Sequence, residues 1–167
     1  VTTTINDTID PTGGTGDDNL DAVTWAITGE TAINEGDSAT YTISLDGPGP
    51  LQAGEDASIV LSLTNLTTNA DGSDLATEAE FDAAVDAAVA TYNTNAGVSE
   101  NAPGSLSYDA SNNTLTHVSD GTSMTPLSVD LTAVNDTLVE GPEDYTVSLA
   151  TPTSTTGGAV TLDTAND

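Results

Sequence analysis

Apolar and polar residues alternate with a period of two along much of this chain. In the run from Ala39 to Leu45, Tyr41, Ile43 and Leu45 fall on one face. Such alternation is typical of strands with one face in a core and the other in solvent. Similar runs, separated by Gly-, Asn- and Asp-rich segments, lie at 23–28, 57–63, 105–108, 114–118, 127–134, 145–149 and 159–162. The pattern predicts an all-β domain, an antiparallel β-sandwich with Ig-like, Greek-key connections.

One Ala-rich segment, from Thr77 to Tyr92, breaks this alternation. Its apolar residues recur at helical spacing, and Thr77 with Glu80 forms the sequence signature of a capping box. Acidic residues also dominate its first turn, where the helix dipole favours negative charge. We therefore expect one amphipathic helix at about 77–92, inserted in the sandwich and docked through Phe81, Val85, Val89 and Tyr92.

The first 22 residues differ from the rest. Val1–Ile5 has the composition of a strand, and residues 6–22 are rich in Asp, Gly and Thr, as in a linker. We interpret 1–22 as a terminal strand and acidic linker from a junction between repeats, and 23–167 as the sandwich domain. On this interpretation the strand at Val1–Ile5 is the last strand of a preceding unit, and the chain is a segment of a longer polypeptide.

The charge of the chain restricts its possible functions more than any motif does. The 167 residues include 27 Asp and Glu but no Lys or Arg, giving a formal net charge of -27. Self-repulsion of this size works against a compact state, and bound divalent cations relieve it where carboxylates converge. Because the chain offers oxygen ligands and has no cysteine, Ca2+ is favoured over softer metals.

The acidity argues against nucleic acid and anionic lipid as partners, and no segment is apolar enough to insert in a membrane.

The acidic segment between the last long strands is the strongest candidate for ion binding. Asp136, Glu140 and Glu143 lie between two predicted strands and could converge at one end of the sandwich. Calcium takes six to eight oxygen ligands, so one turn cannot complete its shell. The acidic phrase Asn34-Glu35-Gly36-Asp37, just before the Tyr41 strand, is a natural second contributor.

Three phrases in this chain resemble the Calx-beta family of calcium-binding β-sandwiches. They are Ile33–Ala39, Ala70–Leu75 and, most specifically, the acid-rich stretch from Asp136 to Tyr145. The resemblance covers most of the chain apart from about Thr77 to Pro103, and Val1–Asp7 is similar to the strand and acidic cluster that end a family domain. It implies Ca2+ ligands at Glu35, Asp74, Asp136, Glu140 and Glu143 and in a terminal acidic cluster. That cluster would follow Asp167 here, so either the site is incomplete or Asp163 or Asp167 takes its place. Asn135 stands where the family often has an acid, which weakens one of two adjacent sites.

Two further motifs are weaker. Gly13–Asp21 matches one calcium-binding nonapeptide of RTX proteins, but a calcium roll needs stacked copies, so a flexible acidic linker is the simpler interpretation. Residues 67–78 echo an EF-hand loop but begin with Thr67, and a polar turn is the default there. The secondary ligand candidates from these regions are Asp7, Asp10, Asp17, Asp18 and Asp71.

Nothing in the sequence favours catalysis. His117 is the only histidine and lies in a predicted strand, no nucleophile elbow is present, and aromatic residues make up 4% of the chain. The sequence resembles the extender repeats of long RTX-type bacterial adhesins. It therefore predicts a secreted, cell-surface, non-enzymatic spacer that binds Ca2+ and acts as a monomer beside neighbouring repeats. The alternative is a calcium-dependent adhesion module that binds a sugar or peptide, with a host or surface ligand left open.

Overall fold

The alternating runs form eight strands, and the Ala-rich segment forms one helix. The computed structural model describes residues 22–34, 36–66, 77–133, 144–155 and 160–164. The strands are β1 (Val23–Gly29), β2 (Ser38–Asp46), β3 (Asp56–Asn65), β4 (Leu106–Asp109), β5 (Thr114–Val118), β6 (Leu127–Thr132), β7 (Tyr145–Ser154) and β8 (Val160–Leu162). The helix α1 spans Glu78–Ala96. The sequence-based bounds agree with these within a few residues.

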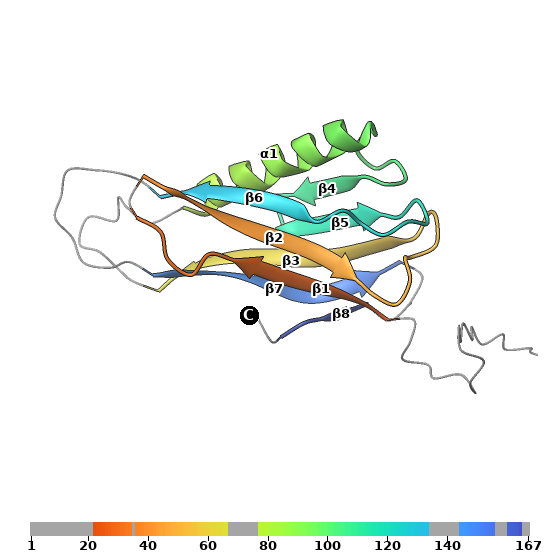
Figure 1. Ribbon diagram of the computed structural model, residues 1–167, viewed down its shortest axis with the longest axis horizontal. Coiled ribbons are helices and arrows are strands. Elements are labelled where there is room, and N and C mark those ends of the chain that lie inside the picture. Colours follow the sequence, from red (N-terminus) through yellow and green to blue (C-terminus); the bar gives the residue numbers. More distant parts are fainter. Residues whose placement is uncertain (1–21, 35, 67–76, 134–143, 156–159, 165–167) are drawn as a thin grey trace, which may run out of the picture.

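Two four-stranded sheets face each other, as the sequence predicts (Figure 1). One has the order β6-β2-β1-β8 and the other the order β4-β5-β3-β7. All pairs are antiparallel except one: β8 runs parallel to β1, with Val23 opposite Val160 and Trp25 opposite Leu162. The predicted sandwich is therefore confirmed, with one parallel pair at this edge that the prediction did not specify. Alternation along a strand sets which side chains face inward, but it does not set the direction of the neighbouring strand.

The core forms where the inward faces of the sheets meet. Trp25, Ile59 and Leu115 are fully buried, and on the predicted inward face of β2, Ile43 and Leu45 are buried whereas Tyr41 is half-exposed. Trp25 is thus a central residue of the core, whereas Tyr145 is only half-buried. His117 is also inside, with 3% exposure, and its Nδ1 lies 3.2 Å from the carbonyl oxygen of Ser105. It is therefore a packing residue.

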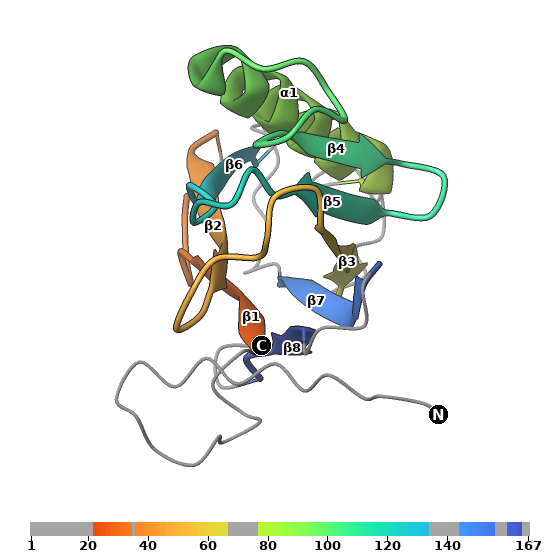
Figure 2. The ribbon, with the colours of Figure 1, turned by 90° about the vertical axis from the view of Figure 1, so that its right-hand side faces the viewer.

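The inserted helix covers one side of the sandwich (Figure 2). Its capping box is as predicted: the Thr77 hydroxyl accepts from the backbone N–H of Glu80, and the Glu80 carboxylate accepts from the Thr77 N–H at 2.8 Å. Gly97 ends the helix in the left-handed conformation, with φ of 69°, which glycine adopts without steric cost. Phe81, Val85 and Val89 are buried against β6, β4 and β3.

A buried asparagine fastens the helix to the sheet beneath it. The Asn93 side chain donates to the carbonyl oxygen of Leu106 at 2.8 Å and accepts from the Leu106 N–H at 2.9 Å. Leu106 is the first residue of β4, an edge strand, so the amide supplies the pairing that a further strand would otherwise give. The helix extends four residues beyond the predicted end at Tyr92, and this contact lies in the extension.

Candidate functional site

Most of the predicted ligands lie outside the described residues. These are Glu35, Asp74, Asp136, Glu140, Glu143, Asp7, Asp10, Asp17, Asp18, Asp71 and Asp167. Asp163 is described. It follows β8, and its backbone N–H donates to the carbonyl oxygen of Trp25 at 2.8 Å. The RTX-like nonapeptide also lies outside the described residues. Of the EF-hand-like phrase, Glu78 opens α1, and its carboxylate accepts from the Asn113 side chain at 2.9 Å.

The described segments beside the main candidates meet at one end of the sandwich, which we term the loop end. On one sheet, the Gly36 N–H donates to the carbonyl oxygen of Ala133 at 3.2 Å, and the Ala133 N–H donates to that of Asp37 at 3.0 Å. On the other, the Leu66 N–H donates to the carbonyl oxygen of Asp144 at 2.8 Å. The connections 30–37, 66–77 and 133–144 therefore all leave or enter strands at the loop end (Figure 1).

Carboxylates at the loop end have neutral partners. Glu30 accepts from the Thr40 N–H at 3.0 Å, Asp37 accepts from the Asn34 side chain at 2.9 Å, and Asp130 accepts from the Thr40 hydroxyl at 2.6 Å. None of these bonds removes negative charge. Within the described segments, no group of three or more His, Asp or Glu side chains is close enough to hold a metal ion.

A cleft opens between the sheets beside the loop end, with a volume of about 510 Å³. We call it the sheet-edge cleft; β1 and the residues after it line one wall, and the start of β7 lines the other. Across it, the Tyr41 hydroxyl donates to the Tyr145 hydroxyl at 2.9 Å, and the two rings meet edge to face with centroids 6.4 Å apart. Burial, with help from the Tyr145 hydrogen bond and the Glu30 carboxylate, raises the pKa of the Tyr41 hydroxyl. Tyr41 is therefore a neutral hydrogen-bond donor at ordinary pH.

Gly29, which lines this cleft, is needed because the Tyr41 ring lies against its backbone. It lies opposite Tyr41 in the β1–β2 pair, and a Cβ at this position would overlap the Tyr41 ring. The ring therefore covers the glycine, which lets the aromatic side chain lie flat across the end of β1.

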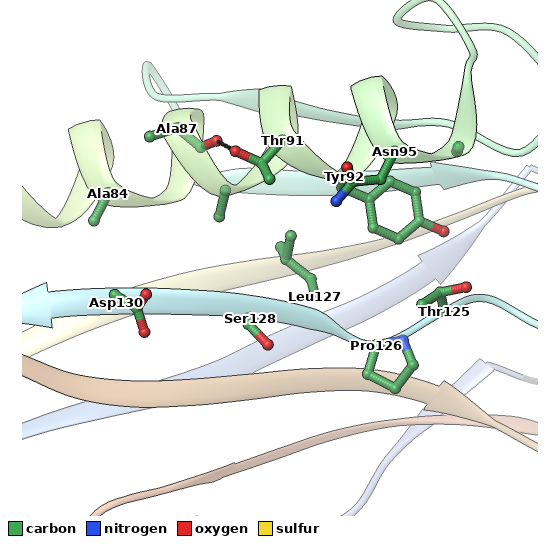
Figure 3. Close-up of a pocket in the computed structure, with 12 residues that line it drawn as sticks. Ala84, Ala87, Thr91, Tyr92, Asn95, Thr125, Pro126, Leu127, Ser128 and Asp130 are labelled. Atoms are coloured by element: carbon green, nitrogen blue, oxygen red, sulfur yellow. Dashed lines mark hydrogen bonds between the residues drawn. The ribbon is translucent and has the colours of Figure 1, made fainter.

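A second hollow, of about 630 Å³, runs between α1 and β6 (Figure 3). We call it the helix groove. Alanines of the helix line one wall, and Ser128 and Asp130 of β6 line the other, with Tyr92, Asn95 and Thr125 toward one end. Burial raises the pKa of the Tyr92 hydroxyl, so this side chain is neutral as well. A groove that combines one aromatic ring, an amide, hydroxyls and a carboxylate offers both stacking and polar contacts to a small neutral ligand.

Sequence reasoning identified neither hollow as a site. The run of small residues at Ala84, Ala87 and Ala88 is the signal for the helix groove, because small side chains leave space between a helix and its neighbour. The sheet-edge cleft has no comparable signal. It depends on β8 ending after three residues while β1 continues to Gly29, which only the strand pairing reveals.

Comparisons with known proteins add no identification: no protein-family model, curated protein or solved structure matches this chain. No helix of the described segments has the length and apolar character needed to cross a bilayer.

Proposed function

We propose that this chain is a calcium-binding structural spacer from a secreted bacterial adhesin, held among neighbouring repeats of the same polypeptide at the cell surface. The observation that carries the proposal is charge. With 27 acidic residues and no Lys or Arg, the chain has no Lys or Arg side chain that could neutralise facing carboxylates. The resemblance of Asp136–Tyr145 to the Calx-beta family supports calcium as the ion.

The described ends of three acidic connections lie at the loop end, which supports it as the place of binding. Gly36 and Asp37 are hydrogen-bonded to Ala133 in one sheet, and Leu66 is hydrogen-bonded to Asp144 in the other. The proposed ligands are Glu35, Asp74, Asp136, Glu140 and Glu143. When bound there, Ca2+ would remove repulsion between the connections and stiffen the joint to the next repeat. The protein would then act as a monomeric rod segment without catalytic chemistry.

Calcium should raise the melting temperature. At a concentration 100-fold above the dissociation constant, one site stabilises the folded state by about 2.7 kcal/mol, or roughly 5–10 °C for a domain of this size. The measurement is thermal unfolding with Ca2+ and with EDTA, at matched ionic strength and with Mg2+ as a second comparison. An unchanged melting temperature with EDTA would remove the proposal.

Two matched double variants distinguish calcium coordination from a simple reduction of negative charge. D136N combined with E140Q removes two proposed ligands, whereas D86N combined with E100Q removes two exposed carboxylates on α1 and in the turn after it. Both lower the negative charge equally. We expect the calcium-induced rise to be lost in the first and retained in the second.

One observation favours a second candidate function, a calcium-dependent module that binds a sugar. The helix groove presents Tyr92, Asn95 and Asp130 beside a neutral alanine wall, which suits a neutral saccharide better than an anion. A glycan array probed with and without Ca2+ tests this candidate. Hits that vanish on replacement of Asn95 by Ala would favour it, and a blank array would leave the spacer role alone.

A further inference from the structure

The only histidine and the only methionine of this chain line the same cavity. The cavity has a volume of about 50 Å³ and lies at the end of the sandwich opposite the loop end, where β1 begins and β2 and β5 end. His117 belongs to β5, and Met124 belongs to the segment that leads from β5 into β6 of the facing sheet. Because the chain has no cysteine, its single imidazole and its single thioether are its softest metal ligands, and both lie at this place.

The His117 ring presents an unprotonated nitrogen. Its Nδ1 lies 3.2 Å from the carbonyl oxygen of Ser105, and because a carbonyl only accepts, we assign the ring proton to Nδ1. Nε2 then carries a lone pair, and no described residue is hydrogen-bonded to it. Metal-bound histidines commonly donate their other N–H to a backbone carbonyl, which fixes the orientation of the ring. The His117 side chain is 3% exposed, so the surrounding core holds this orientation as well.

The charges around His117 favour a cation beside the ring. Burial lowers the pKa of His117, so the imidazole is neutral near pH 7 and its lone pair is available to a metal ion. The carboxylates of Asp120 and Asp56 act in the opposite sense on this pKa, because their negative charge stabilises positive charge at the ring. A metal ion bound to the ring would be attracted by the same two carboxylates.

The available ligands suit a soft ion of low coordination number. No three His, Asp or Glu side chains of the described segments are close enough to hold a metal, so Zn2+, which takes four ligands, lacks its usual cage here. Thioether sulfur prefers soft ions such as Cu(I), and imidazole binds copper as well. The carboxylates of the chain prefer hard cations such as Ca2+ and therefore compete weakly for a soft one. A cavity of about 50 Å³ has room for one such ion.

We propose that this cavity binds one Cu(I) ion between Nε2 of His117 and the sulfur of Met124. The ion joins β5 of one sheet to the segment that enters β6 of the other, and so links the two sheets at this end of the sandwich. The site is separate from the proposed calcium function, because it uses a different class of ligand and shares no residue with it. Water is the alternative occupant of the cavity.

Titration with Ag+, followed by NMR, tests this proposal. Ag+ is a soft ion with the charge of Cu(I), and unlike Cu(I) it is stable in air. Labelling histidine with 15N and the methionine methyl group with 13C gives one signal each, since the chain has one of each residue. In chloride-free buffer with excess Ca2+ to occupy the carboxylates, both signals should shift together and stop shifting at one equivalent of Ag+. A histidine signal that moves alone, or a titration without this end point, would overturn the proposal.

Variants of the lining residues provide the control. M124L keeps nearly the volume of the side chain and removes its sulfur, so the protein should fold and bind Ag+ at least about tenfold more weakly. H117Q removes the ring nitrogen and should abolish the end point. D46N changes an exposed carboxylate that lines the same cavity and should bind Ag+ as the native protein does. Unchanged affinity in M124L, or an equal loss in D46N, would contradict the assignment of the ligands.

Two repetitions of the titration complete the test. Cu(I), added without oxygen and with ascorbate as reductant, should reach the same end point and move the same two signals. The variant that combines D136N with E140Q lacks two proposed calcium ligands and should bind Ag+ as the native protein does. Loss of the end point in that variant would overturn the proposal, because the ion would then be held by carboxylates. Failure of Cu(I) to move either signal would do so too.

Discussion

Different elements cover the two lateral sides of this sandwich. On one side, α1 lies over the edge strands β6 and β4, and Phe81, Val85 and Val89 are 1%, 0% and 6% exposed. On the other side, β8 supplies three residues, and Tyr145, Val147 and Leu162 remain half-buried. We call these the helix side and the cleft side. Among the described residues, the side chains on the helix side are therefore more deeply buried than those on the cleft side.

The largest expected effect comes from Phe81, which anchors the helix side. Replacing it with alanine leaves a cavity in the core and should lower the free energy of unfolding by about 3–5 kcal/mol. The corresponding change on the cleft side, V147A, removes less buried surface and should cost below about 1.5 kcal/mol. Urea unfolding of both variants measures the contrast. Equal losses would show that the two sides are equally closed.

Asn93 should give the next largest effect. N93A removes both side-chain hydrogen bonds to Leu106 and leaves two backbone groups unpaired in a buried place. Such a loss costs about 1–3 kcal/mol. The exposed neighbour Asn95 is the matched control, and N95A should change stability by at most about 0.5 kcal/mol. If N93A were as mild as N95A, the amide bridge would not hold α1 to β4.

His117 should make the stability of the protein depend on pH, and it lies on the helix side, beside Ser105 just before β4. Burial lowers the pKa of His117, so the unfolded chain binds a proton more readily than the folded one between the lowered pKa and the ordinary value of about 6.5. The contribution of His117 to the free energy of unfolding is therefore fully present above about pH 6.5. It is lost as the pH falls from about 6.5 to the lowered pKa. Urea unfolding between pH 5.5 and 7.5 should show this slope in the native protein. The slope should be smaller in H117Q.

The smallest effect belongs to the cleft side. Y145F removes the hydroxyl that accepts from Tyr41 but keeps the ring contact. Because both rings are half-exposed, water replaces the lost partner, and we expect about 0.5–1 kcal/mol of destabilisation. Thermal unfolding measures it. A cost near that of N93A would mean that the tyrosine pair holds the two sheets together as strongly as Asn93 holds α1 to β4.

The strands and the helix follow from local patterns, and these were predictable. Alternation at Tyr41, Ile43 and Leu45 defines a face, and the Thr77–Glu80 capping box fixes the start of α1. Each signal depends on residues that lie close together in the sequence. The sandwich and its inserted helix are therefore confirmed, with the helix longer than its apolar pattern indicates.

The contacts between distant segments were not predictable from these patterns. The parallel pairing of β8 with β1 and the Asn93 bridge to Leu106 each depend on how elements meet in space. A polar residue at position 93 ends the apolar stripe of the helix, so periodicity alone places the helix end too early. The calcium ligands stay predictions, because all of them except Asp163 lie outside the described residues.

The neutral partners of the carboxylates have a consequence for solutions of high ionic strength. Asp82 accepts from the Tyr108 hydroxyl, Asp109 from Ser111 and Asp120 from Thr122. The sequence contains no Lys or Arg, so dissolved salt has no Lys or Arg ion pair to weaken, while it screens the repulsion among the acidic groups. High salt, which lowers the free energy of unfolding of many proteins that depend on ion pairs, should therefore raise it for this protein.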